Sequence, residues 1–260
     1  MRVRVPSLPV LTKSLERLRR TRRSRREALA QYGKLAPDEA IAIDSTPPSE
    51  NAAGDLVTTD SIRPVVLRND VRIEDPLRVV LGYLETWRFD VGDPSRPTSF
   101  DESDLRLANR AGARISAAEI ATILERRRAI ERALRGIASH ASLAARQNTV
   151  PWPTLTQLFD AFADIRGVGF SKMTKALHPK RPALIPMLDS VVQAYLQDDD
   201  LGAQASFGER ALALVRGYKR DLDGNSAALR AVRQEITTRG HSLTEVRILD
   251  LLIWSVQAAA

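Results

Sequence analysis

Residues 164–190 read D-I-R-G-V-G-F-S-K-M-T-K-A-L-H-P-K-R-P-A-L-I-P-M-L-D-S, and the G-V-G turn near their start decides the predicted fold. The pattern predicts a helix that ends at Ile165, a tight turn, and a second helix that begins at Phe170. Glycine permits positive φ and lets another group approach the backbone closely. The N–H groups of the turn and of the second helix form a site suited to a phosphate. We expect Val168 to pack between the two helices and hold the turn closed.

The charges in this stretch favour an anion-binding surface. No acidic residue lies between Ile165 and Leu188, whereas five basic residues do. Phosphate contacts are therefore predicted for Arg166, Gly167, Val168, Gly169, Lys172, Lys175, Lys180 and Arg181. In the simpler alternative, Gly-x-Gly only ends one helix and begins the next, and the basic side chains are solvated surface.

The same stretch resembles the core of the helix-hairpin-helix DNA glycosylases of the endonuclease III and adenine-glycosylase type. Those proteins have L-P-G-V-G in the hairpin and a catalytic aspartate in a P-x-L-D-x-x-V segment. This chain has I-R-G-V-G at 165–169 and P-M-L-D-S-V-V at 186–192. In the family, the residue two places after the second glycine precedes the aspartate by 18 positions, and here Ser171 precedes Asp189 by 18 positions.

The resemblance implies a monofunctional DNA glycosylase that hydrolyses the N-glycosidic bond of a flipped base. Asp189 would stabilise the positive charge that develops on the sugar, and orient or deprotonate a water molecule. Ser171 stands where bifunctional members have a lysine nucleophile, so no lyase step is expected. Lys172, one residue later and rotated by about 100° on a helix, is a lesser candidate nucleophile. Candidate residues for wedging or stacking against the DNA are Trp152, Phe100 and Trp87.

Two further interpretations stay open. The chain can be a non-catalytic helix-hairpin-helix DNA-binding protein, in which Asp189 is only the N-cap of the next helix. It can also be a structural or protein-interaction module. Arg166 replaces the hairpin proline of the family, and Lys172-Met173 replace its Thr-Ala. Segments 180–182 and 247–254 are also similar to a poorly characterised bacterial family that shares the G-V-G … L-I-P-M-L-D-S core, which supports the fold and leaves the activity open.

The composition excludes several kinds of site. The chain has no cysteine, which removes disulfides, thiolate catalysis and cysteine-ligated zinc or iron–sulfur clusters. Its three histidines are scattered, so no metal or other cofactor is expected. The run Asp198–Asp200 is interpreted as a solvated loop. No apolar run approaches the roughly 20 residues of a membrane span, and no signal-peptide pattern is found. We expect a cytoplasmic protein that does not enter a membrane.

The positive charge is concentrated at the N-terminus. The chain has a net charge of +7, and residues 1–26 carry ten basic residues and one acid, so the other 234 residues sum to −2. Residues 1–60 are predicted to be a disordered basic tail, because 37–60 is rich in Pro, Ser, Thr, Asp and Gly. The tail can be a solvated extension, an arm that binds nucleic acid phosphates, or a targeting presequence.

Residues 61–260 predict an all-α, helix-hairpin-helix glycosylase-like domain, with a possible subdomain seam at 147–153. Ser116 and Glu119 form a capping box ahead of apolar positions that extend to Leu134. Asp101 or Ser99 caps a helix that runs to Asn109. Other helices are predicted after Pro76 and Thr154 and at 170–178, 189–197, 206–222, 225–239 and 243–257. Sustained period-2 alternation is absent from the sequence, so few strands are expected. Arg247 and Asp250 are predicted to form a structural ion pair, and Trp254 to lie in the core.

Overall fold

The computed structural model describes residues 62–86 and 96–259, all of which belong to the second of the two units into which the chain divides, residues 57–260. The all-α prediction is confirmed for these residues, which contain ten α-helices and one two-stranded sheet. The tail at 1–60, its boundary and Trp87 lie outside the described residues.

The helices follow one another with short connections. The α-helices are α2 (Pro76–Thr86), α3 (Glu102–Arg110), α4 (Ala117–Glu125), α5 (Arg127–Arg135), α6 (Trp152–Asp160), α7 (Phe170–Leu177), α8 (Ser190–Tyr195), α9 (Phe207–Gly224), α10 (Ser226–Thr238) and α11 (Glu245–Ala259). The 3₁₀ helices are η1 (Arg68–Asp70), η2 (Gln147–Thr149), η3 (His178–Lys180) and η4 (Gln197–Asp199). The predicted seam at 147–153 covers η2 and the start of α6, and it stays a prediction.

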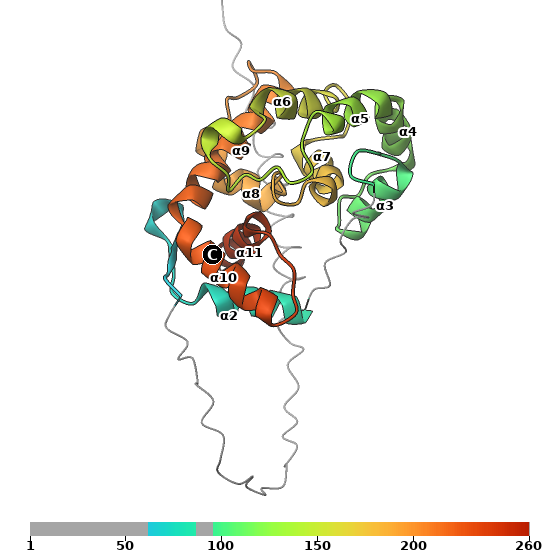
Figure 1. The fold of residues 1–260 in the computed structure, drawn as a ribbon. Coiled ribbons are helices and arrows are strands. Elements are labelled where there is room, and N and C mark those ends of the chain that lie inside the picture. Colours follow the sequence, from blue (N-terminus) through green and yellow to red (C-terminus); the bar gives the residue numbers. More distant parts are fainter. Residues whose placement is uncertain (1–61, 87–95, 260) are drawn as a thin grey trace, which may run out of the picture. The chain divides into compact units, whose positions relative to one another are not determined.

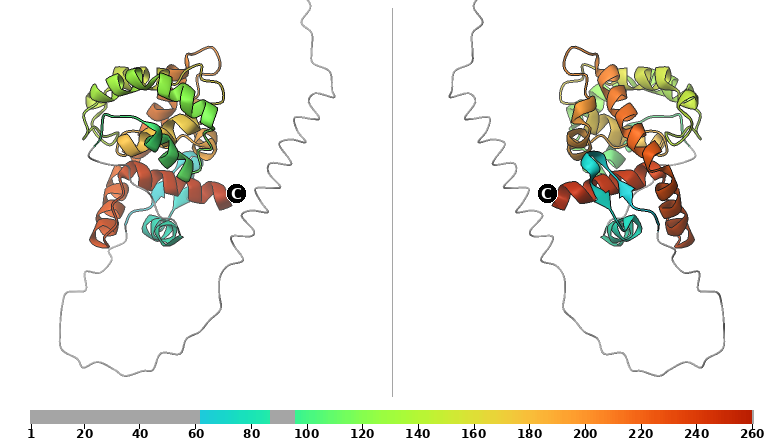
Figure 2. Two further views of the ribbon diagram at one scale, coloured as in Figure 1. Left: turned by 90° about the vertical axis from the view of Figure 1, so that its right-hand side faces the viewer. Right: turned by 90° about the vertical axis from the view of Figure 1, so that its left-hand side faces the viewer.

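The helices pack in two groups that α9 connects. α6 lies along α9, and α9 also contacts α10 and α11. At one end α2 packs against α10 and α11, and at the other α3 to α6 form an arc (Figure 1; Figure 2). α7 packs on α3, whereas α8 packs on α11. The predicted hairpin helix and the segment that follows it therefore lie between the two groups.

A small sheet precedes α2 and is fixed to α9 by side chains. β1 (Val65–Val66) pairs antiparallel with β2 (Arg72–Ile73). The Asn225 side chain accepts from the Val66 N–H and donates to its carbonyl, both at 2.8 Å. These bonds satisfy the edge of a strand too short to be stable alone.

The acidic run after α8 was interpreted as a solvated loop, which is wrong for Asp199 and Asp200, because both form ion pairs, whereas Asp198 is exposed. Arg68 lies between the strands and pairs with Asp199 at 2.6 Å and with Asp221 at 2.8 Å. Asp200 accepts two bonds from the Arg210 guanidinium, at 2.8 and 2.7 Å. Arginines outside the acidic run therefore neutralise carboxylates for which the sequence shows no evident partner.

The predicted capping residues are confirmed. Ser116 and Glu119 form the capping box of α4, and Asp101 caps α3 through the Ser103 N–H at 2.8 Å. The stretch after Ser116 is two helices rather than one, since Arg126 leaves the helical conformation at φ −88° and ψ 0°. In the residues that the structure describes, no helix is long and apolar enough to cross a membrane.

Candidate nucleic-acid interface

The predicted hairpin has an exposed turn, but its first helix ends earlier than predicted. α6 ends at Asp160 rather than at Ile165, and residues 161–164 form turns closed by i→i+3 hydrogen bonds. The Val168 N–H donates to the Ile165 carbonyl at 3.0 Å and closes the turn. The Val168 side chain is buried in the core, as expected from the sequence.

The two glycines of the turn have different roles. Gly167 has φ +83°, which favours glycine, and a Cβ there would lie 2.3 Å from Oε1 of Glu119 and displace that carboxylate. Gly169 has φ −103° and no atom within 4 Å of a Cβ position, so the prediction that it needs positive φ is wrong. Gly169 is the N-cap of α7 and provides no side-chain cap. Arg166, Gly167 and Gly169 are all exposed.

Lys172 is held by a carboxylate that the sequence analysis did not associate with the hairpin. Its Nζ lies 2.6 and 2.7 Å from the two oxygens of Glu119, and only 21% of the side chain is exposed. Burial acts to raise the pKa of Glu119, but hydrogen bonds from Lys172 and Ser116 lower it overall. The Lys172 charge is therefore neutralised locally, which weakens its case as a nucleophile or a phosphate contact.

Asp189 is the N-cap of α8 and is 7% exposed. Its Oδ1 accepts from the N–H groups of Val191 at 2.9 Å and Val192 at 3.1 Å. Its Oδ2 accepts from the indole N–H of Trp254 at 3.1 Å. The Trp254 contact was missed in the sequence analysis, although a buried indole N–H requires an acceptor. Both carboxylate oxygens therefore have protein donors.

The hairpin helix is joined directly to the segment that carries Asp189. The Thr174 hydroxyl donates to the Phe170 carbonyl at 2.8 Å and accepts from the Leu188 N–H at 3.0 Å. Nδ1 of His178 lies 2.6 Å from the Ile185 carbonyl oxygen. Ser171, half-buried on α7, makes no side-chain hydrogen bond within the described part of the chain. The structure thus joins α7 to the Asp189 segment without a bond between Ser171 and Asp189.

Further charged side chains lie around Asp189. Burial lowers the pKa of Lys175, nearby Asp189 opposes this effect, and Arg247 and Arg114 add to it. Arg247 lies 3.6 Å from Asp250, so the predicted ion pair is confirmed. Burial raises the pKa of Asp250 to about 7 against the opposing charge of Arg247, and Asp189 raises it further.

Lys180 and Arg181 are buried, so the prediction that they contact phosphates is wrong. The Lys180 ammonium pairs with Asp104 at 2.7 Å, with 4% of its side chain exposed. Arg181 is 1% exposed, and its guanidinium donates to carbonyls at 2.7 or 2.8 Å. These acceptors are the carbonyls of Pro97, Leu134, Ile137 and Lys180. Both side chains hold α3 and α5 to the segment after α7.

Of the residues considered as DNA wedges, Phe100 and Trp152 lie in the described part of the chain. Phe100 is fully buried and packs edge-on against Phe162, with centroids 6.1 Å apart, so its prediction as a wedge is wrong. Trp152 donates to the Gln147 carbonyl at 3.1 Å and lies under the guanidinium of Arg216.

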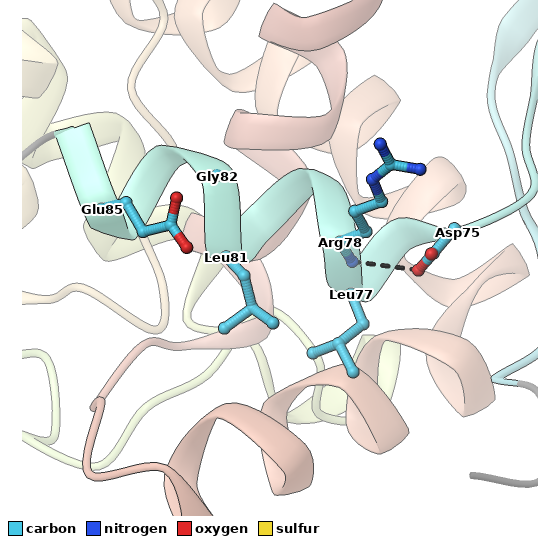
Figure 3. A pocket seen from close by; sticks show the side chains of 6 residues that line it. All are labelled: Asp75, Leu77, Arg78, Leu81, Gly82 and Glu85. Carbon is cyan, nitrogen blue, oxygen red and sulfur yellow. Dashed lines mark hydrogen bonds between the residues drawn. The ribbon is translucent and has the colours of Figure 1, made fainter. Parts of the chain in front are cut away.

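Two shallow hollows in the described residues lie elsewhere. One follows α2, lined by Asp75, Leu77, Arg78, Leu81, Gly82 and Glu85 (Figure 3). The other lies beside η4 and α9, between Asp198 and Arg220. Neither contains a residue of the hairpin, nor Asp189.

Comparison with known proteins assigns the chain to a family through most of this domain. Curated proteins and solved structures gave no match. Residues 79–257 match the model of DUF6308, a family of unknown function, and this range covers the hairpin, the Asp189 cap and α11. The chain therefore belongs to the family DUF6308.

Proposed function

We propose that this protein binds DNA as a helix-hairpin-helix module. The turn Arg166–Gly169 and the first turn of α7 contact a phosphate group of the backbone. Asp189 acts in this proposal as the cap of α8, and no chemical step is required of it.

The uncapped start of α7 carries the proposal. The first N–H groups of an α-helix have no partner within the helix, and they carry the positive end of its dipole. Gly169 offers no side chain to satisfy them, and the exposed Arg166 adds a positive charge beside them. A phosphate group satisfies such donors. The alternative, that the turn only links two helices, does not account for an exposed glycine at a position where a side chain has room.

We expect Gly169→Asp to weaken DNA binding at least about tenfold, or about 1.4 kcal/mol. The new carboxylate would bind the N–H groups of α7 and repel a phosphate. Gly169→Ser is the matched control, since Ser and Asp cap helices equally well and both fit the open space there. Fluorescence anisotropy with a labelled duplex measures the affinity, and thermal unfolding verifies the fold. Equal affinities of the two folded variants would contradict the proposal.

DNA glycosylase activity is the second candidate function, favoured by one contact. The Thr174–Leu188 hydrogen bond joins the hairpin helix to the residue before Asp189. A glycosylase needs a carboxylate near the hairpin that holds the DNA, which this connection provides. The Trp254 indole would have to move from Oδ2 before a sugar could reach Asp189.

Asp189→Asn tests this second candidate. Asn keeps the cap through its Oδ1 while the carboxylate is lost. Because its Nδ2 cannot accept the Trp254 indole N–H, thermal unfolding verifies the fold of the variant. If the protein is a glycosylase, base release should fall by about 100-fold or more. The assay incubates duplexes that carry a panel of damaged bases and uses alkali to reveal abasic sites. Asp198→Asn, at an exposed position, is the control. A parent protein that releases no base, or an Asn variant as active as the parent, would remove this candidate.

A further inference from the structure

Lys175 differs from the other basic residues near the hairpin. Its ammonium makes no hydrogen bond or ion pair within the described residues, and its side chain is half-buried on α7. Lys172, on the same helix, is bound by both oxygens of Glu119. Nζ of Lys175 lies against Gly112, where a Cβ would be 3.8 Å away. A cation held close to a loop backbone, without a partner, is positioned to receive an anion.

The loop that faces Lys175 carries a second basic residue, Arg114. Residues 111–115 connect α3 and α4, and Asn109 holds them by donating to the Ile115 carbonyl at 2.9 Å and accepting from its N–H at 2.6 Å. Gly112 has φ +77° and Arg114 has φ +56°. For arginine this left-handed conformation is strained, and such strain persists where the surrounding structure fixes it, often at functional sites. Arg114 is exposed and has no partner among the described residues.

Three charged groups act on Lys175. Asp189 has the largest effect among them, and Arg247 and Arg114 act as positive charges. Arg247 is paired with Asp250. Asp189 is held by three N–H groups and forms no ion pair with Lys175. Since Arg114 and Lys175 make no hydrogen bond or ion pair within the described residues, both are available for an external anion.

We propose that Arg114 and Lys175 form a second phosphate-binding site, which takes another phosphate group of the DNA strand that contacts the hairpin. This inference rests on the proposed DNA binding. Lys175 lies five residues after the start of α7, about 7 Å along the helix axis. The second site is therefore separated from the hairpin turn and takes a different phosphate of the strand.

The salt dependence of DNA binding tests the site. Each phosphate contact contributes a slope of about 0.9 to the fall of log affinity with log salt. We expect Lys175→Gln and Arg114→Gln each to lower this slope by about 1, and to weaken binding to unrelated duplex sequences equally. Lys175→Arg keeps the charge and should keep the slope. Arg128→Gln, which replaces an exposed arginine of α5 outside the hairpin and the 111–115 loop, is the control and should leave the slope unchanged.

The outcomes separate this site from the hairpin. If Gly169→Asp weakens binding but either Gln variant at 114 or 175 keeps the parent slope, the second site is wrong and the hairpin proposal stands. An equal loss in Arg128→Gln also overturns it, since any exposed arginine would then suffice. A parent without salt-dependent DNA binding overturns both proposals. Because Arg114 is exposed, its replacement tests the site even if Lys175→Gln unfolds the protein.

Discussion

Replacing Arg181 with Met should lower the free energy of unfolding by about 3–5 kcal/mol, because four carbonyls would each lose a buried donor. The guanidinium bonds to carbonyls of Leu134 and Ile137 at the end of α5 and of Pro97 before α3. Met fills a similar volume but donates nothing. Denaturation by urea measures the loss, which corresponds to a fall in Tm of roughly 10 °C for a domain of this size.

Two further variants isolate the cause of this loss. Arg128→Met removes an exposed arginine from α5 and should change stability by less than about 0.5 kcal/mol. Arg181→Lys keeps the charge but not the planar fork, so it should remain clearly less stable than the parent. An Arg181→Met variant as stable as the parent would show that water replaces the guanidinium at no cost.

Arg181 also illustrates why the site was only partly predictable from sequence. Its segment lacks acidic residues, which made an exposed basic surface the natural interpretation. Three of its four acceptors are backbone carbonyls 44, 47 and 84 positions away, and carbonyls leave no signature in a sequence. Lys180 was misjudged for the same reason, because its partner Asp104 belongs to α3. Burial of a charged side chain is set by tertiary contacts, which local charge counts do not contain.

Features that depend on neighbouring residues were predicted well. The capping box at Ser116 and Glu119 and the cap at Asp101 involve residues two or three positions apart, so the sequence contains the complete interaction. Asp189 as a helix cap is of the same kind. Its bond to Trp254 spans 65 positions and could not be found in this way. The end of α6 was also missed, since the turns at 161–164 depend on how the hairpin packs.

Asp250 is a fully buried carboxylate near the candidate site, more buried than Asp189. Its side chain is fully buried on α11, and Oδ1 has no hydrogen-bond partner within the described residues. Oδ2 faces Arg247 at 3.6 Å and the Met187 N–H at 3.4 Å. The other titratable groups that act on it are Asp189 and Tyr218. Burial, the largest effect, raises the pKa of Asp250 from 3.8 to about 7, so the folded protein favours its neutral form.

Asp250→Asn should therefore reduce the loss of stability that accompanies rising pH. A raised folded pKa contributes stability that is complete below the unfolded pKa and is lost as pH rises towards 7. The rise from 3.8 to about 7 corresponds to about 4 kcal/mol. Asn imitates the neutral acid at every pH. The stability of the variant relative to the parent should thus increase by about 4 kcal/mol between about pH 4 and about pH 8, as measured by urea denaturation.

The variant must be compared with the parent because His178 makes stability depend on pH in the opposite sense to Asp250. Burial lowers the pKa of His178 to about 4, with Arg247 adding to the effect, so its contribution is lost as pH falls below 6.5. That contribution is present in both proteins and cancels in the difference. Glu125→Gln, which removes an exposed carboxylate, controls for the change in net charge. A difference between Asp250→Asn and parent that stays constant with pH would mean that Asp250 is ionised in the folded protein. Its pairing with Arg247 would then balance the effect of burial on its pKa.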